Sequence, residues 1–191
     1  LHSLYSIHYR NSFELGNGLA RKHFEQLSAS KVGTHPILND IGRPRLGYCG
    51  ALSARLNWDL IRGIADMRPD WNLIFVGPRL GAVPDALLAD FKNIHLLDAV
   101  EYEQLPSLFR SLDIGIMPYL DNPFFQALNP LKFYEYAAAG IPCVSSPIPE
   151  LGRFDQSFVR VCDNTPQAWV KAISEHLDAD VIANRETGTK I

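Results

Sequence analysis

Residues 129–150 read NPLKFYEYAAAGIPCVSSPIPE, which predicts a short helix followed at once by a buried strand. Asn129 is a suitable N-cap, because its side-chain oxygen can accept a hydrogen bond from a free amide of the first turn. Pro130 suits the first helical position, where its missing N–H costs nothing. Gly140 supplies the left-handed residue that ends the helix, and the proline two residues later prevents the helix from resuming. The apolar run Ile141–Ile148 is the predicted strand.

Lys132 and Glu135 are the two charged residues of this otherwise apolar helix. They are three apart, so they share one face. A helix N-terminus carries about half a positive charge and unpaired N–H groups, which suits phosphate, and Lys132 adds to that field. Glu135 repels phosphate but can accept two hydrogen bonds from a sugar diol, as acidic residues do for ribose. The alternative interpretation is an ordinary exposed ion pair.

From Arg45 onwards, strand patterns alternate with helical patterns. Asn57 and Thr165 are expected to cap two of the helices. This alternation predicts an α/β, Rossmann-like, doubly wound parallel sheet. The predicted strands are Leu46–Gly50, Asn72–Gly77, Asn93–Leu97, Ile114–Tyr119, Ile141–Ile148 and Phe158–Cys162, and the predicted helices lie near residues 58–65, 84–91, 102–112, 130–139 and 166–177.

The carboxyl ends of the strands form the candidate site, because ligands of such sheets bind there. The first strand ends in Gly50 and Ala51, where the absence of a side chain at Gly50 lets a ligand approach the backbone. The loop Leu120–Leu128 follows the fourth strand and leads into the helix of residues 130–139. Packing onto the core is the expected role of its Phe124 and Phe125, and contact with a sugar is the alternative.

The composition is that of a globular chain: of 191 residues, 47% are hydrophobic and 20% charged, with a net charge of -3. Without a Lys/Arg block we expect no nucleic-acid partner, and no apolar run is long enough for a transmembrane segment. The histidines and cysteines show no metal-ligand spacing, so we expect no metal. Cys49, Cys143 and Cys162 are expected to be core residues in a reducing compartment. The absence of Gly-x-Gly-x-x-Gly and phosphate-loop motifs disfavours nicotinamide and ATP sites, and we expect no resident cofactor.

The run NPLKFYEYAAAGIPCV, residues 129–144, resembles the nucleotide-sugar motif of bacterial glycosyltransferases of the family-four, or group 1, kind. These enzymes have two Rossmann-like domains, the GT-B architecture. The resemblance implies that Glu135 holds the donor ribose, that Lys132 and Arg55 lie near the diphosphate, and that the backbone of Val100 reads the base. The alternative for Arg55 is a solvated loop residue. Gly50, Ala51, Asn129 and Leu131 complete the predicted donor-binding set.

The same resemblance implies a division of the chain. Asn17, Gly18 and Phe24 loosely match the passage between the two domains of the family. We therefore expect residues 1–42 to be the end of a missing N-terminal domain plus an interdomain linker, and residues 43–191 to be the nucleotide-sugar-binding domain. Residues 20–40 are polar and irregular, as in a linker, and Ser12–Leu15 is a candidate short strand.

Two positions depart from the family pattern. Many relatives carry two glutamates eight positions apart, and counting back from Glu135 leads to Ala127. Asp98 stands where the family usually has glycine. The second glutamate is present, so ribose binding is expected, whereas recognition of the donor sugar is left open.

The implied activity is transfer of a sugar from a UDP- or GDP-linked donor to an acceptor, with retention and without a metal. Lys132, Arg55 and Glu135 form the expected catalytic set, in which the cations stabilise the leaving diphosphate. A sugar, glycolipid or polysaccharide acceptor is expected to bind mainly to the missing N-terminal domain, so the chain alone is expected to bind nucleotide weakly and to be inactive. The family works in polysaccharide biosynthesis, in the cytoplasm or at the inner face of the plasma membrane. The alternatives are a nucleotide-sugar epimerase of the same architecture and a catalytically silent binding module.

Overall fold

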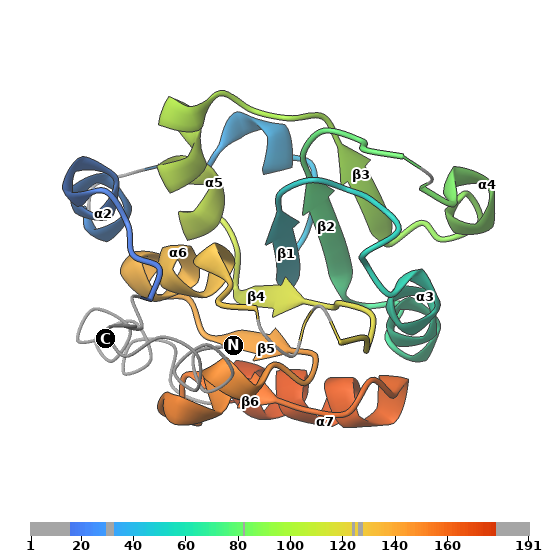
Figure 1. The fold of residues 1–191 in the computed structure, drawn as a ribbon. Coiled ribbons are helices and arrows are strands. Elements are labelled where there is room, and N and C mark those ends of the chain that lie inside the picture. Colours follow the sequence, from blue (N-terminus) through green and yellow to red (C-terminus); the bar gives the residue numbers. More distant parts are fainter. Residues whose placement is uncertain (1–15, 30–32, 82, 124, 126–127, 179–191) are drawn as a thin grey trace.

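The structure, a computed structural model, describes residues 16–29, 33–81, 83–123, 125 and 128–178. Six parallel strands form one sheet in the order β3-β2-β1-β4-β5-β6 (Figure 1). They are β1 Arg45–Cys49, β2 Asn72–Val76, β3 Ile94–Leu97, β4 Ile114–Met117, β5 Cys143–Ser145 and β6 Val159–Val161. The predicted parallel α/β sheet is confirmed.

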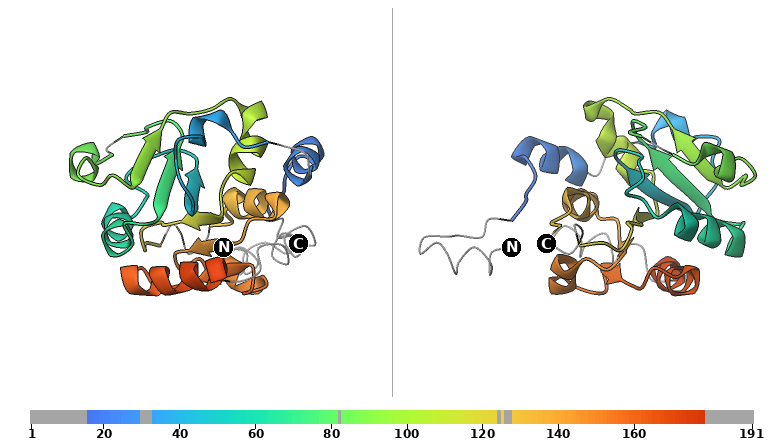
Figure 2. Two further views of the ribbon diagram at one scale, coloured as in Figure 1. Left: turned by 180° about the vertical axis from the view of Figure 1, so that it is seen from behind. Right: turned by 45° about the vertical axis from the view of Figure 1, so that its right-hand side comes forward.

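Helices cover both faces of the sheet, as Figures 1 and 2 show. Helices α5 and α6 lie on one face with α2 packed outside them, and α3 and α7 pack together on the other. The helices are α2 Arg21–Ser28, α3 Trp58–Met67, α4 Asp85–Leu88, α5 Leu105–Arg110, α6 Leu131–Ala139 and α7 Pro166–Asp178, with 3-10 turns at Pro36–Leu38, Tyr102–Gln104 and Pro149–Arg153. None of the helices within these described ranges is long and apolar enough to span a membrane.

Close packing brings α6 against the middle of the sheet. A Cβ on Gly115 of β4 would lie 2.6 Å from the ring of Tyr136, so only glycine leaves room for that ring. The buried Tyr136 hydroxyl donates hydrogen bonds to the carbonyls of Gly47 at 2.9 Å and Ile116 at 3.3 Å. These bonds tie the helix to β1 and β4, so its first turns lie near the carboxyl ends of those strands.

Several predicted helix ends are confirmed. The Asn57 side chain accepts a hydrogen bond from the Leu60 amide at 3.0 Å, and Thr165 Oγ1 accepts one from the Ala168 amide at 3.3 Å. Gly140 has φ 67°, the left-handed conformation expected of a helix C-cap. In each case the signal lies within a few residues of the helix end.

The predicted start of α6 is wrong by one residue. The helix begins at Leu131, so Pro130 takes the N-cap position, and no side chain caps the helix. Asn129 is instead held through its backbone, because its carbonyl accepts a hydrogen bond from Asn17 Nδ2 at 2.6 Å. The predicted strand Ile141–Ile148 is also too long, since only its residues 143–145 pair in the sheet.

The prediction that residues 20–40 are irregular is wrong for residues 21–28. Residues 21–28 form α2, and His23 and Leu27, four positions apart, are buried on one side of it. A helix of eight residues is marginal by itself, and its packing on α5 and α6 stabilises it. The candidate strand Ser12–Leu15 lies outside the described residues.

Candidate functional site

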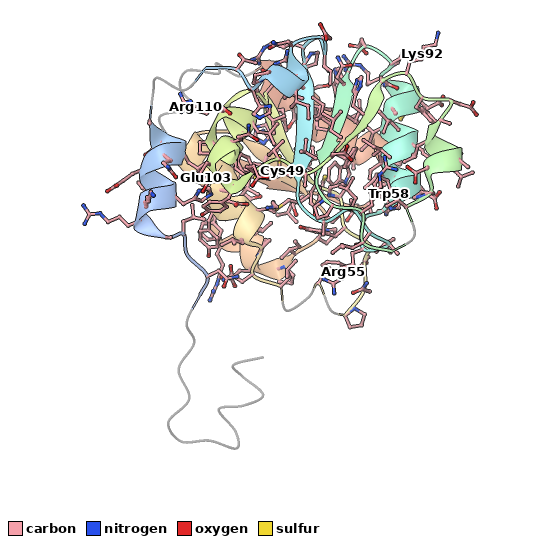
Figure 3. All side chains as sticks on the ribbon, turned by 90° about the horizontal axis from the view of Figure 1, so that it is seen from above. Cys49, Arg55, Trp58, Lys92, Glu103 and Arg110 are labelled. Atoms are coloured by element: carbon pink, nitrogen blue, oxygen red, sulfur yellow. The ribbon has the colours of Figure 1, made fainter. Side chains whose placement is uncertain are left out.

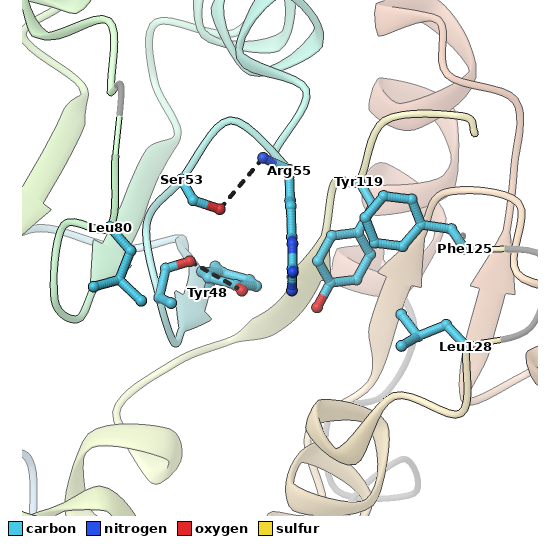
Figure 4. Close-up of a pocket in the computed structure, with 8 residues that line it drawn as sticks. Tyr48, Ser53, Arg55, Leu80, Tyr119, Phe125 and Leu128 are labelled. Atoms are coloured by element: carbon cyan, nitrogen blue, oxygen red, sulfur yellow. Dashed lines mark hydrogen bonds between the residues drawn. The ribbon is translucent and has the colours of Figure 1, made fainter. Parts of the chain in front are cut away.

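The strand order places a crevice beyond the carboxyl ends of β1 and β4. The chain passes from β1 to β2 on one side and later adds β4 on the other, and ligands of open α/β sheets bind at such a switch. A cavity of about 350 Å³ lies there (Figure 4). It is lined by Tyr48, Ala51, Ser53, Arg55, Leu80, Tyr119, Phe125 and Leu128.

Arg55 lies on a loop that is fastened to both neighbouring strand ends. The Leu52 amide donates to the Pro78 carbonyl at 2.9 Å, and the Leu120 amide donates to the Arg55 carbonyl at 3.0 Å. Figure 4 shows the guanidinium group extending between the rings of Tyr48 and Tyr119. Arg55 is exposed, yet the loop holds its positive charge at the cavity wall.

Lys132 and Glu135 form a largely buried ion pair. Lys132 Nζ donates to Glu135 Oε2 at 2.8 Å, and the two side chains are 22% and 6% exposed. The interpretation as an ordinary exposed pair is therefore wrong. Placing two charges where water is mostly excluded is unfavourable unless they are well paired, which makes this pair unlike the surface pairs of the molecule.

Gly50 lies directly beneath the stem of Lys132. A Cβ on Gly50 would be 2.9 Å from Lys132 Cε and 3.1 Å from Tyr48 Oη. Lys132 thus occupies the space that was predicted for a ligand at Gly50. Tyr48 also lies against Gly50 and lines the cavity, so it connects the ion pair with the cavity. Burial raises the pKa of Tyr48, and the positive charges of Lys132 and Arg55 act in the opposite direction.

The structure adds His23, which the sequence did not indicate. Its Nε2 lies 3.6 Å from Glu135 Oε1, and its ring stacks on Tyr102 with centroids 4.6 Å apart. The only local signal was the spacing of His23 and Leu27 on one helical face. In Figure 3, Glu103 and Arg110 mark the side of the domain that α2 covers, whereas Arg55 lies on the opposite side of Cys49.

The remaining predicted residues lie around this centre. Ala51 lines the cavity, and Leu131, the first residue of α6, is 44% exposed. Val100 is half-buried against the core, in the segment between β3 and the turn at Tyr102, and it is not among the cavity-lining residues. Phe125 is buried and stacks on Tyr119, as expected of a packed loop residue. Phe124 and Ala127 lie outside the described residues.

The site combines two cations with one carboxylate. Arg55 places a positive charge at the cavity wall, and Lys132 places another beside Gly50. A diphosphate bound between them could pair with both. Glu135 lies one turn further along α6, where it can accept hydrogen bonds from hydroxyl groups. Within the described part of the chain, no three His, Cys, Asp or Glu side chains gather in a way that could hold a metal ion.

Comparison with known proteins identifies the family of this domain. The family model described as "Glycosyl transferases group 1" matches residues 43–179. A Bacillus subtilis protein, TuaH, provisionally named as a teichuronic acid biosynthesis glycosyltransferase, is 33% identical over 116 residues. That match covers 60% of this chain and 29% of TuaH.

Solved structures that are similar in fold include the following two. AviGT4, a glycosyltransferase involved in avilamycin A biosynthesis, matches with a TM-score of 0.67 and 13% identity over 94% of this chain and 52% of its own. Anabaena Alr3699/HepE, solved in complex with UDP and glucose, matches with a TM-score of 0.62 and 13% identity over 92% of this chain and 50% of its own. The chain thus spans about half the length of these proteins, and the likeness confirms the predicted fold.

Proposed function

Because the chain belongs to the group 1 glycosyltransferases, we propose that it binds the nucleotide diphosphate of a sugar donor, for transfer of the sugar to an acceptor. The observation that carries this proposal is that Arg55 lines the cavity at the carboxyl ends of β1 and β4, while Lys132 lies over Gly50 at the end of β1 and pairs with Glu135. Two cations suit the diphosphate, and the carboxylate suits the ribose hydroxyls. The UDP and glucose named for HepE support a donor of this class.

Lys132 has two partners in this proposal. Without a ligand it donates to Glu135 Oε2 at 2.8 Å. A diphosphate entering beside Gly50 attracts Lys132 away from Glu135, and the released carboxylate oxygen then accepts a ribose hydroxyl. The same movement of Lys132 thereby opens both the diphosphate subsite and the ribose subsite. The base then binds to the backbone near Val100.

The catalytic role of the cations follows from where charge develops. When the sugar leaves, negative charge accumulates on the diphosphate, and Lys132, Arg55 and the N-terminus of α6 stabilise it. This replaces the charge neutralisation that a metal ion provides in other transferases. We propose that the reaction retains the configuration of the sugar and needs neither a metal nor a resident cofactor.

The acceptor and the setting are also part of the proposal. In the GT-B architecture the acceptor binds mainly to the other domain. We assign residues 1–42 to the end of that domain and the linker that follows it, within which α2 packs on α5 and α6 of the present domain. The name of TuaH supports synthesis of a cell-surface polysaccharide. Such a reaction takes place in the cytoplasm, at the inner face of the plasma membrane.

Calorimetric titration of the 191-residue chain with UDP and with GDP tests the site. Lys132→Ala and Glu135→Ala are each expected to weaken binding of the preferred nucleotide about tenfold or more, because each removes a charge-assisted contact worth about 1.5–3 kcal/mol. Lys92→Ala is the matched control, because Lys92 is exposed and lies away from the site in Figure 3. Unfolding curves establish that each variant is folded.

Each outcome separates this function from the alternatives. Binding that neither Lys132→Ala nor Glu135→Ala weakens would place the site elsewhere. Absence of binding by either nucleotide at millimolar concentration would favour a catalytically silent module. Conversion of a nucleotide sugar by the complete protein without any acceptor would favour an epimerase.

A further inference from the structure

His23 is a buried histidine that faces the carboxylate of the site. Its side chain is 3% exposed, and neither ring nitrogen has a hydrogen-bond partner among the residues that the structure describes. Nε2 lies 3.6 Å from Glu135 Oε1. That distance is slightly too long for a hydrogen bond, so a small rotation of the carboxylate would form one.

We propose that His23 is a positioning residue for Glu135: it holds Oε1, so that the carboxylate keeps its orientation when Lys132 leaves Oε2 for the diphosphate. This inference rests on the proposed function. It assigns part of the ribose subsite to α2, a helix that precedes the residues matched by the family model, 43–179.

The two oxygens of Glu135 have different neighbours, which is the basis of the assignment. Oε2 accepts the hydrogen bond of Lys132 at 2.8 Å, whereas Oε1 faces the imidazole. Among the residues that the structure describes, Lys132 is the hydrogen-bond donor to Glu135, so when Lys132 moves to a phosphate and before a ribose hydroxyl arrives, the buried carboxylate would be poorly solvated and free to rotate. The imidazole supplies a donor at that moment, and the bond also satisfies a ring nitrogen whose burial without a partner is unfavourable.

The imidazole is itself held in place from two sides. Its ring stacks on Tyr102, with centroids 4.6 Å apart and planes inclined by 26°. The helix that carries it is anchored by the fully buried Leu27, whose carbonyl accepts a hydrogen bond from Arg110 at 3.3 Å. A donor supported in this way can orient a carboxylate, because it loses little conformational freedom when the bond forms.

The first test compares ribose with deoxyribose. The nucleotide is UDP or GDP, whichever the chain binds. Its affinity is measured and compared with the affinity of the 2′-deoxy form of the same nucleotide. His23→Phe keeps an aromatic ring against Tyr102 but lacks the ring nitrogens, and His23→Gln keeps a donor. The control is Lys22→Ala, an exposed position on the same helix.

His23→Phe is expected to weaken binding of the ribonucleotide about five- to tenfold, the effect of losing one hydrogen bond to a charged group. The deoxynucleotide should change less than about twofold, His23→Gln should restore most of the loss, and Lys22→Ala should have no effect. A purely structural role would weaken both nucleotides equally. That result, or an unchanged affinity for the ribonucleotide, would overturn the inference.

The second test needs no nucleotide. A double-mutant cycle of His23→Phe and Glu135→Gln in urea unfolding should show a coupling of at least about threefold in the unfolding equilibrium constant, as for residues in direct contact. Additive effects would overturn the inference even if the nucleotide binds as proposed. Coupling without binding of either nucleotide would refute the proposed function, and with it the ribose role of His23, while establishing the contact.

Discussion

Glu135 carries a negative charge in a place where most side chains are apolar. Its neighbours on α6 include Phe133, Tyr136 and Ala137, all of them buried. The carboxylate is tolerated because Lys132 pairs with one oxygen and His23 faces the other. In the proposed donor site, opening this pair would require energy, so part of the interaction with a diphosphate would be spent in releasing Lys132. At the residue scale, the Lys132–Glu135 ion pair stabilises the site without ligand and would therefore lower its affinity for a diphosphate.

Gly50 tests the position of Lys132 without removing its charge. The new methyl group of Gly50→Ala would lie 2.9 Å from Lys132 Cε, so the flexible end of the lysine must shift. We expect the affinity for the nucleotide to fall about three- to tenfold, while the free energy of unfolding changes by less than about 1 kcal/mol. Calorimetry and urea unfolding measure the two quantities.

The matched control for this prediction is Gly152→Ala. Gly152 is exposed, and a Cβ there would meet nothing within 4 Å. Gly152→Ala should leave the affinity for the nucleotide unchanged. If Gly50→Ala also leaves it unchanged, Lys132 does not need its present position to bind the diphosphate.

Helix α2 shows how far an element's role depends on its partners. Its sequence is polar on most sides, and only His23 and Leu27 are buried. Packing of those two residues against α5 and α6 makes the segment part of the domain, on the side of the site where Glu135 lies. An isolated peptide of this length would have little helical structure in water.

Leu27→Ala tests whether α2 belongs to the cooperative fold. Leu27 is fully buried, so its truncation should lower the free energy of unfolding by about 2–3 kcal/mol. Urea unfolding monitored by circular dichroism measures this loss. Arg21→Ala is the control: its side chain is 92% exposed in a pair with Glu25, and its effect should stay within about 0.5 kcal/mol. No loss of stability in Leu27→Ala would mean that α2 is docked without contributing to the fold.

Other elements were predictable because their signals are local. The cap of α3 by Asn57 and the end of α6 at Gly140 each depend on a few adjacent residues. The extent of β5 was overestimated, because an apolar run records burial, whereas a strand requires a partner with which to pair. Residues 141–146 and 148 are buried, whereas backbone hydrogen bonds to β4 extend beyond residues 143–145 only to Pro142 and Ser146.

At the scale of the whole molecule, buried histidines make stability depend on pH. Burial, and then the charge of Arg160, lowers the pKa of His176 from 6.5 to about 4. Burial also lowers the pKa values of His35 and His95. The unfolded chain takes up these protons more readily than the folded chain does. The stability that His176 contributes is therefore complete above about pH 6.5 and is lost as the pH falls towards 4.

His176 alone should remove about 2 kcal/mol from the free energy of unfolding between pH 7.5 and pH 5. Urea unfolding at the two pH values measures this in the wild-type chain and in His176→Gln. The variant can be less stable throughout, but its loss between the two pH values should be smaller by about that amount. An equal loss in both chains would show that His176 does not cause the dependence.

The sequence by itself determined the alternation of strands and helices, the caps at Asn57 and Gly140, and the shared face of Lys132 and Glu135. These features arise from the period of the backbone and from hydrogen bonds between near neighbours. The tertiary structure alone decided that Lys132 lies over Gly50 and that His23 faces Glu135. Those contacts join residues far apart along the chain, and they depend on the order of the strands and on the packing of α2, which no local pattern specifies.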